Sequence, residues 1–325
     1  MSQPTRSSTI YQLRHFITRR FTRHSGNSAK SDAVVYLMLA PGIIGLLVFS
    51  VYPILWGMRY MFYEYDGFRT PVFIGIDNFV RVFTRDPDYW NAVKNTFIYA
   101  GGKLAITLPI AFILAVLLNL KIRGRTIFRT LIFMPTIISM GIMSLVFYFI
   151  FNTYNGIVNQ VLLRNELIQQ PIAWLGMDLA LLTCIIVAVW GAVGNYMIYF
   201  LAGLQTIPTE MYESADIDGA SALQKVFYIT LPMLGPVLQM IMMLAIVVSL
   251  KGGYESIMVL TGGGPFGASD VMFLRVFYLF FNAPANVYFA QEYGYGAAVA
   301  FVSAIIVSLV TLIFLYWSKK MNETF

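Results

Sequence analysis

Charged residues are scarce in this chain, and their scarcity excludes most soluble folds. Asp, Glu, Lys and Arg make up 12% of the 325 residues, whereas a soluble domain carries roughly 25%. Hydrophobic residues make up 58%, and the mean hydropathy is +0.69. So little polar surface could not cover a globule in water. The composition therefore predicts an integral membrane protein.

Cysteine and histidine are nearly absent, which excludes disulfide frameworks and the common metal centres. The single cysteine, Cys184, lies in an apolar run, and His15 and His24 both lie in the basic N-terminal region. No metal site is therefore predicted. The phosphate-binding pattern G-x-x-x-x-G-K-[ST] is missing too, since the nearest string, Gly101–Lys103, continues with Leu104 inside an apolar run. Nucleotide hydrolysis is not expected of this chain.

Long apolar runs, in contrast, are abundant. Each is long enough to cross a hydrocarbon core of about 30 Å as a helix. The runs are continuous, whereas the strands of outer-membrane barrels alternate apolar and polar residues over about ten positions. We therefore expect an all-α integral membrane fold with about six transmembrane helices. The expected spans are Ala33–Met58, Ala92–Leu120, Phe128–Phe151, Leu179–Leu204, Met233–Leu260 and Tyr293–Trp317.

The distribution of Lys and Arg predicts how these spans are oriented. Both residue types concentrate in the first 32 residues, in the loop after the second span and in the C-terminal tail, which share one side if six spans are right. Both termini are therefore expected in the cytoplasm. The chain would divide into a basic segment (1–32), a transmembrane domain (33–317) and a cytoplasmic tail (318–325). The basic segment could be an interfacial helix on anionic lipid or a disordered tail.

One loop on the expected cytoplasmic side departs from this positive bias. Residues 205–232 join the fourth and fifth spans and carry four acids against Lys225. Pro208 marks a helix start, Gly219 marks a turn with close approach or a positive φ, and Pro232 ends a second helix. The pattern predicts a helix–turn–helix with exposed small residues, on which another backbone could approach closely. Acids at a helix N-terminus suit its dipole and can pair with an Arg.

The spacing in this loop resembles the EAA motif of permease subunits in bacterial binding-protein-dependent ABC importers. Glu213-Ser214-Ala215 is followed after three residues by Gly219, after nine more by Ile229, and after one more by Leu231-Pro232. Ser214 stands where the motif usually has Ala, and both residues are small. The strings "LAPGIIGLLVFSVYPILWGM", "GIDNFVRVF", "WNAVKNTFIYA" and "LTGGGP" look like the carbohydrate-uptake class, in particular its maltose-permease-F-like subunit.

The resemblance implies a type I ABC importer permease fold in the bacterial cytoplasmic (inner) membrane. The chain would form a heterodimer with a second permease subunit, surrounded by membrane lipid, and would receive an oligosaccharide from an extracytoplasmic solute-binding protein. Two separate ATPase subunits would bind ATP and Mg, so this chain would be no enzyme and would hold no cofactor; no nucleic acid is implied. The loop would be a coupling helix that docks in a cleft of an ATPase subunit. The docking residues would be Glu213, Ser214, Ala215, Asp218 and Gly219.

Polar and aromatic residues in the fourth and fifth spans are candidates for sugar contacts. Aromatic faces stack on sugar rings, and Asn and Tyr side chains hydrogen-bond to hydroxyls. For the aromatic residues of the fourth span, packing between helices is the competing interpretation. The candidates are Asn195, Tyr196, Tyr199, Lys251, Tyr254 and Glu255.

Lys251 allows three interpretations, of which the simplest is a lysine at a helix end that faces water. A lysine near the middle of the bilayer costs roughly 2.5–3.5 kcal/mol, so it should face a cavity or a partner. It could pair with Glu255 one helical turn later, or it could offer its ammonium to an anionic group of the substrate. The last interpretation predicts an acidic (uronate) oligosaccharide. The alternative for the whole chain is a secondary transporter or channel without an ATPase partner, for which only Glu255 would be a coupling acid.

Overall fold

The computed structural model describes residues 28–120, 122–281 and 290–322, and these residues fold almost entirely into helices. The predicted all-α class is confirmed. The chain divides into two compact units, Met1–Arg59 and Tyr60–Phe325. Most of the basic segment predicted for residues 1–32 lies outside the described residues, as does the end of the tail beyond residue 322.

The described part of the first unit is one apolar helical run. Helix α2 (Ser28–Leu46) continues through the π-helical turn η1 (Leu47–Val51) into α3 (Tyr52–Met58). The π-helical turn lies just before Pro53, which has no N–H to donate and disturbs the preceding turn. None of the side chains in the apolar window of this run is buried, as expected for a helix that contacts lipid or another subunit.

The second unit opens with a short section of turn, hairpin and helix. Its elements are η2 (Arg59–Phe62), β1 (Tyr63–Glu64), β2 (Val72–Phe73) and α4 (Asp77–Thr84). The two strands pair antiparallel, with Tyr63 opposite Phe73. Asn78 joins α4 to the hairpin, because its side-chain amide lies 3.0 Å from the carbonyl oxygens of both Met61 and Tyr63.

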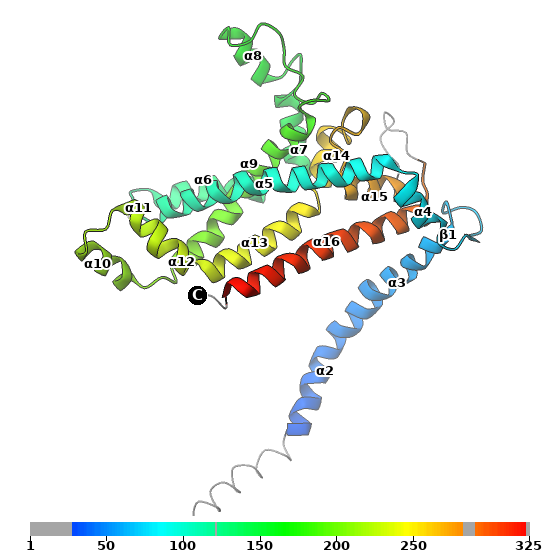
Figure 1. The fold of residues 1–325 in the computed structure, drawn as a ribbon, viewed down its shortest axis with the longest axis horizontal. Coiled ribbons are helices and arrows are strands. Elements are labelled where there is room, and N and C mark those ends of the chain that lie inside the picture. The colour runs from blue at the N-terminus through cyan, green and yellow to red at the C-terminus, as the bar shows by residue number, and fades with distance from the viewer. Residues whose placement is uncertain (1–27, 121, 282–289, 323–325) are drawn as a thin grey trace, which may run out of the picture. The chain divides into compact units, whose positions relative to one another are not determined.

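Three long helices frame the second unit. They are α5 (Pro87–Asn119), α9 (Ala180–Leu204) and α16 (Tyr293–Asn322). Helices α5 and α9 run side by side (Figure 1), and their inner faces bury Tyr99, Met197 and Phe200. Helices in a membrane associate by close packing, for which small residues are needed. Gly194 of α9 is one of them, since a Cβ there would lie 2.3 Å from the carbonyl oxygen of Ile132.

Two further spans are broken by sharp bends. Helices α6 (Arg125–Ile137) and α7 (Met140–Ile150) meet at 95°, and the segment Ala222–Met233 meets α13 (Gly235–Leu250) at 72°. Four continuous helices among the described residues are long and apolar enough to cross a membrane, and six spans result if each bent pair counts as one. The predicted number of about six agrees with the larger count.

The predicted bounds of the second and fifth spans are among those that differ from the structure. Helix α5 begins at Pro87, five residues before the expected Ala92, because the Asp86 side chain caps it by accepting the Tyr89 N–H at 2.9 Å. The fifth span is not continuous over Met233–Leu260. Helix α13 ends at Leu250, and α14 (Tyr254–Leu260) starts after a three-residue break.

The remaining elements lie at the two ends of the bundle or beside it. They are α8 (Ile157–Arg164), α10 (Thr209–Ile217), α11 (Ala222–Lys225), η3 (Val226–Thr230), α12 (Leu231–Met233), η4 (Pro265–Gly267) and α15 (Met272–Phe280). Helices α10 to α12 lie at one end of the bundle, here called the α10 end (Figure 1). Helix α4, the start of α5 and the start of α16 lie at the opposite end, here called the α4 end. Each end carries a candidate site.

Candidate functional site

The predicted helix–turn–helix is present at the α10 end, and its turn has the geometry that requires glycine. Gly219 has a φ of +74°, so the predicted positive φ is confirmed. The N–H of Ala220 donates to the carbonyl of Ala215 at 2.9 Å, and the N–H of Gly219 donates to that of Asp216 at 3.2 Å. This pair of bonds is the Schellman arrangement, in which the left-handed residue is usually glycine. A Cβ on Gly219 would meet nothing within 4 Å, so the backbone conformation, not space within this chain, requires glycine.

Local contacts hold the two helices of this loop together. Ser221 and Gln224 form a capping box at the start of α11, with bonds of 2.7 and 3.4 Å. Asp216 of α10 forms an ion pair with Lys225 of α11. The hydroxyls of Tyr212 and Thr230 lie 2.9 Å apart and join α10 to η3. These contacts make the loop a stiff unit.

The outer surface of the loop combines charge with exposed apolar side chains. Glu213, Ser214, Asp218 and Gly219 are exposed, and Glu213 has no ion pair among the described residues. Ala215 differs from the other predicted docking residues, because its side chain is buried within this chain.

Sequence reasoning missed two features of the loop. Ile217, at the end of α10, is 87% exposed although it is apolar. A hollow of about 260 Å³ lies between the turn and the second helix, lined among others by Asp218, Gly219 and Tyr228. The visible signal was an isolated apolar residue between two aspartates at the helix end. The exposed Ile217 side chain and the hollow leave room for a protein partner to make contact.

The predicted sugar contacts on α9 have different surroundings. Asn195 is half-buried, and Tyr199 is 36% exposed. Tyr196 is 4% exposed and belongs to the helix core, with its ring 6.2 Å from that of Tyr199. In this structure Tyr196 therefore packs between helices, which was the competing interpretation for the aromatic residues of this span.

The predicted pair of Lys251 and Glu255 does not form, and the helix break explains why. Gly252 and Gly253 have φ values of +80° and +53°, so the two charged residues do not lie one turn apart on a single helix. Both side chains are exposed, and no ion pair joins them within the described residues. The break is tightly built, since a Cβ on Gly253 would lie 2.1 Å from the Tyr99 hydroxyl oxygen.

Tyr254, the last predicted sugar contact, is half-buried at the start of α14. Its ring lies 6.0 Å from that of Phe277 in α15. Helix α9 contacts both α13 and α14, so the predicted residues of the two spans lie on neighbouring elements.

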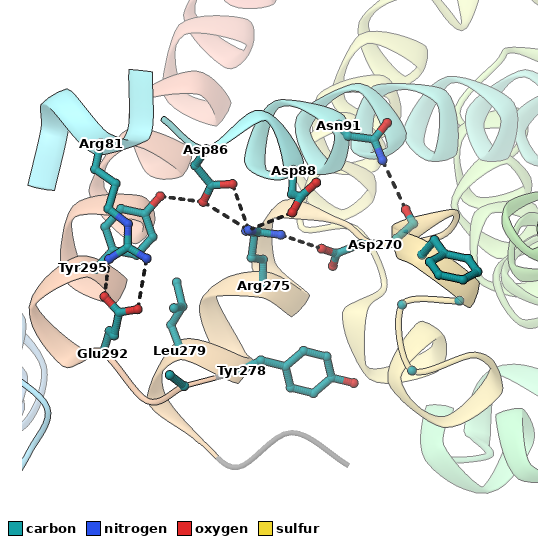
Figure 2. A pocket seen from close by; sticks show the side chains of 16 residues that line it. Arg81, Asp86, Asp88, Asn91, Asp270, Arg275, Tyr278, Leu279, Glu292 and Tyr295 are labelled. Carbon is teal, nitrogen blue, oxygen red and sulfur yellow. Dashed lines mark hydrogen bonds and ion pairs between the residues drawn. The ribbon is translucent and has the colours of Figure 1, made fainter. Parts of the chain in front are cut away.

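A second candidate site, which sequence reasoning missed, lies at the α4 end. A hollow of about 570 Å³ is surrounded by charged side chains from α4, α5 and α15 and from the residues just before α5, α15 and α16 (Figure 2). Arg275 of α15 lies at its centre and donates to both carboxylate oxygens of Asp86, at 2.9 and 3.1 Å. The Tyr295 hydroxyl of α16 donates to the same carboxylate at 2.6 Å. Arg81 of α4 pairs with Glu292 through two hydrogen bonds. The network connects residues that are far apart in the sequence.

Two carboxylates of this network have opposite pKa shifts. Burial alone would raise the pKa of Asp86, but the Tyr295 hydroxyl, the Tyr89 N–H and Arg275 together hold that pKa below its ordinary value. Burial raises the pKa of Asp270 to about 6, and Arg275 offsets only part of the rise, because its Nη1 lies 3.5 Å from Asp270 Oδ2. Asp86 is therefore ionised at neutral pH, whereas Asp270 takes up a proton when the pH falls slightly below neutral.

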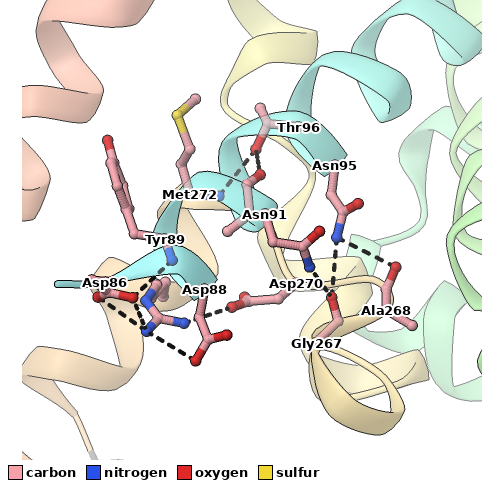
Figure 3. Close-up of polar contacts among 12 residues, drawn as sticks. Asp86, Asp88, Tyr89, Asn91, Asn95, Thr96, Gly267, Ala268, Asp270 and Met272 are labelled. Carbon is pink, nitrogen blue, oxygen red and sulfur yellow. Dashed lines mark hydrogen bonds and ion pairs between the residues drawn. The ribbon is translucent and has the colours of Figure 1, made fainter. Parts of the chain in front are cut away.

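The loop that follows α14 forms one wall of the hollow. The side-chain amides of Asn91 and Asn95 donate to the carbonyl of Gly267, at 3.3 and 3.0 Å (Figure 3). The Thr96 hydroxyl accepts the Met272 N–H at 3.0 Å. These bonds fix residues 267–272 against α5, so the "LTGGGP" string starts a stiff loop.

Known proteins that resemble this chain are transport permeases, and several of them are named for carbohydrates. The family described as binding-protein-dependent transport system inner membrane component matches residues 107–323. The probable ABC transporter permease YesP of Bacillus subtilis is 33% identical over 91% of this chain and 94% of its own length. The arabinooligosaccharides transport system permease AraP of the same organism is 30% identical over 99% of this chain and 98% of its own length. The lactose transport system permease LacF of Rhizobium radiobacter is 32% identical over 89% of this chain and 95% of its own length.

Solved structures show the same similarity. A bacterial ABC transporter involved in the import of the acidic polysaccharide alginate has a TM-score of 0.77 and 25% identity, over 90% of this chain and 98% of that one. The bacterial alginate ABC transporter in complex with an alginate pentasaccharide-bound periplasmic protein has the same TM-score and identity, over 92% of this chain and 98% of that one. The helical fold, the loop around Gly219 and these matches show that the chain belongs to the binding-protein-dependent inner membrane components, as a multi-pass permease subunit of an ABC sugar importer.

Proposed function

We propose that the chain forms half of the membrane pathway of an ATP-driven importer of acidic oligosaccharides, such as uronate oligosaccharides. In this proposal the α10 end and both termini face the cytoplasm. A second permease subunit completes the pathway as a heterodimer. Two ATPase subunits bind and hydrolyse ATP with Mg, and one of them docks on the loop around Gly219. The observation that carries the docking is the stiff, exposed helix–turn–helix at the α10 end.

The contacts of this loop support docking to another protein. Its own hydrogen bonds satisfy the turn, so the loop keeps its shape without a partner. Glu213 remains exposed and can pair with a basic residue of the ATPase subunit. Ile217 and the hollow beside Asp218 offer an apolar contact and a recess for a partner side chain. Apolar anchors with complementary charge are typical of specific interfaces.

The exposed ammonium of Lys251 supports an acidic substrate. Lys251 follows the 16 residues of α13, about 24 Å along the helix from Gly235, which is less than the roughly 30 Å of a hydrocarbon core. A lysine there is expected to face a cavity or a partner. Because Glu255 does not neutralise it, a carboxylate of the substrate can do so. Asn195, Tyr199 and Tyr254 are proposed to contact sugar hydroxyls and rings, while Tyr196 packs. The similar transporter of known structure imports the acidic polysaccharide alginate.

The alternative of a secondary transporter or channel is not favoured. It would leave the stiff acidic loop at the α10 end without a role. It would also need coupling acids within the spans, and the family to which the chain belongs is binding-protein-dependent.

Reconstitution in proteoliposomes tests both parts of the proposal. The chain is combined with the second permease, the ATPase subunits and the binding protein of its transport system, and uptake of a uronate trisaccharide is compared with that of a neutral trisaccharide. We expect ATP-dependent uptake of the uronate. Uptake without ATPase subunits would overturn the docking role, and uptake of the neutral sugar alone would overturn the acidic substrate.

A further inference from the structure

The loop at the α4 end presents one aromatic side chain in a strained conformation. Phe266 has a φ of +52° and a ψ of +35°, and its side chain is 93% exposed. A bulky residue in this region costs energy that a glycine would avoid. The neighbouring residue Gly267 is held by the amides of Asn91 and Asn95, so the strain is maintained by a stiff support. An exposed aromatic ring on a rigid loop is a typical anchor of a protein interface.

The hollow beside Phe266 has an excess of negative charge. Four carboxylates line it against two guanidinium groups, those of Arg81 and Arg275. The guanidinium groups are already engaged with Glu292 and with Asp86 and Asp270 (Figure 2). The hollow therefore repels an anionic ligand and attracts a cationic one.

The hydrogen-bonding groups of the hollow lead to the same conclusion. The amide of Asn91 and the hydroxyl of Tyr295 both donate to partners within the chain. Carboxylate oxygens, in contrast, remain able to accept hydrogen bonds from a ligand. The Asp88 carboxylate is 82% exposed and its nearest cation, Arg275, is 3.9 Å away. Asp270 is 7% exposed, and its Oδ1 has no hydrogen-bond partner among the described residues. A fitting ligand must donate hydrogen bonds and carry positive charge.

We propose that this hollow receives a lysine or arginine side chain of the soluble solute-binding protein, while Phe266 inserts into an apolar recess of that protein. The inference rests on the proposed function, in which the α4 end faces away from the cytoplasm and so toward the binding protein. Membership of the family implies that such a protein is required. The structure adds the contact chemistry, in which an acidic hollow and an aromatic anchor meet a basic face. An acidic oligosaccharide is then delivered by the protein, because the hollow itself would repel it.

Three variants of the complete transporter test this contact. Phe266→Gly removes the ring and also relieves the strained φ, and its melting temperature shows whether the added backbone freedom destabilises the protein. Asp88→Asn removes one charge at an exposed position while keeping the size of the side chain. Glu166→Gly is the matched control, because Glu166 is the other non-glycine residue with a positive φ, +56°, among the described residues.

Binding of the purified solute-binding protein to the transporter in nanodiscs is measured by biolayer interferometry at low and at physiological salt. We expect Phe266→Gly to raise the Kd at least about tenfold with an unchanged or higher melting temperature. Asp88→Asn should raise the Kd roughly threefold to tenfold at low salt and less at physiological salt, because salt screens exposed charges. Glu166→Gly should bind like the wild type. Free arginine should compete for binding better than glutamate at equal ionic strength.

Several outcomes would overturn the inference. Wild-type affinity and salt dependence in both Phe266→Gly and Asp88→Asn would refute the contact. If calorimetry without the binding protein shows that Asp88→Asn changes only the affinity for free trisaccharide, the hollow is a sugar site. Loss of the second permease from the purified variants would make it a contact between subunits. If the wild type transports sugar and the variants bind the solute-binding protein as the wild type does, only the inference about this contact fails. If the wild type transports no sugar, the proposed function fails.

Discussion

The turn at Gly219 allows a graded test of the docking loop. Replacing Gly219 by Ala forces a residue with a Cβ into a φ of +74°. The left-handed conformation costs a non-glycine residue about 1–2 kcal/mol. Since no atom lies within 4 Å of the added Cβ, this backbone cost is the whole expected effect within the chain. The lower conformational entropy of Ala in the unfolded chain offsets about 0.4–1 kcal/mol of it for global unfolding, but not for a local rearrangement of the turn.

The expected result is a loss of coupling without a loss of folding. A cost of one to two kcal/mol changes an equilibrium roughly 5–30-fold, so the population of the docking geometry and the rate of uptake should fall by about that factor. The rate of uptake should fall less in Gly219→Asn than in Gly219→Ala, because Asn tolerates the left-handed region better than other side chains. It should fall more in Gly219→Val, whose side chain is branched at Cβ.

The assay combines sugar uptake in proteoliposomes with co-purification of the ATPase subunits and thermal unfolding of the membrane subunits. Uptake and co-purification should decrease together in the order Gly, Asn, Ala, Val, while the melting temperature of the membrane subunits stays within a few degrees. Equal uptake by the Gly and Ala forms, or an Asn form worse than the Ala form, would refute the reasoning from backbone conformation.

Three further changes probe the docking face, the substrate site and the charged network. Glu213→Lys should abolish ATP-coupled uptake while membrane insertion, measured in isolated membranes, stays normal; normal uptake would contradict docking through this face. Lys251→Met should reduce uptake of a uronate oligosaccharide at least about tenfold and leave a neutral one unchanged, since it removes a charge-assisted bond; equal effects on both sugars would return Lys251 to a structural role. Burial raises the pKa of Asp270 to about 6, beside Arg275 and Asp88, from the ordinary value of 3.8. An acid whose folded-state pKa is raised destabilises the fold above that pKa, and the penalty disappears as the pH falls toward 4. Asp270→Asn should therefore raise the melting temperature at pH 7.5 and lose this gain between pH 6 and 4; the same gain at every pH would contradict burial as the cause.

The helix–turn–helix around Gly219 could be predicted from the sequence because its signals are local. The positive φ at Gly219, the small residues and the helix stop near Pro232 all lie within some twenty consecutive residues, and each acts through the backbone nearby. The contacts within the loop join residues at most 18 positions apart, as in the pair Tyr212–Thr230. Patterns of this range are visible in one sequence.

The break in the fifth span was missed although a signal was present. The apolar run continues on both sides of Gly252 and Gly253, so hydropathy alone predicts one helix. Two adjacent glycines, each roughly 1 kcal/mol less favourable than Ala in a helix, were the available warning. Tyr99, which approaches Gly253, comes from another helix and could not be inferred from the local sequence.

The charged network at the α4 end could not be predicted by any local pattern. Arg275 meets Asp86 across 189 positions, and Tyr295 meets it across 209. Only the fold brings these side chains together, since α5, α15 and α16 all place one end there (Figure 2).

Helix α13 connects the loop around Gly219 to the break at Gly252 and Gly253, so a movement of the loop can be passed to the break. The loop passes through α12 into α13, with a 72° bend at its start, and α13 ends at the residue before Lys251. A helix of 16 residues is a rigid element about 24 Å long, and the break at its far end holds Gly253 against the Tyr99 hydroxyl. Movement of a docked ATPase subunit would therefore reach the Lys251 ammonium through one stiff helix. In a continuous helix over Met233–Leu260, Lys251 would have been held against Glu255, with its charge neutralised. In the proposed function, the break would free that charge for an anionic substrate and leave it at the end of the helix that the loop moves.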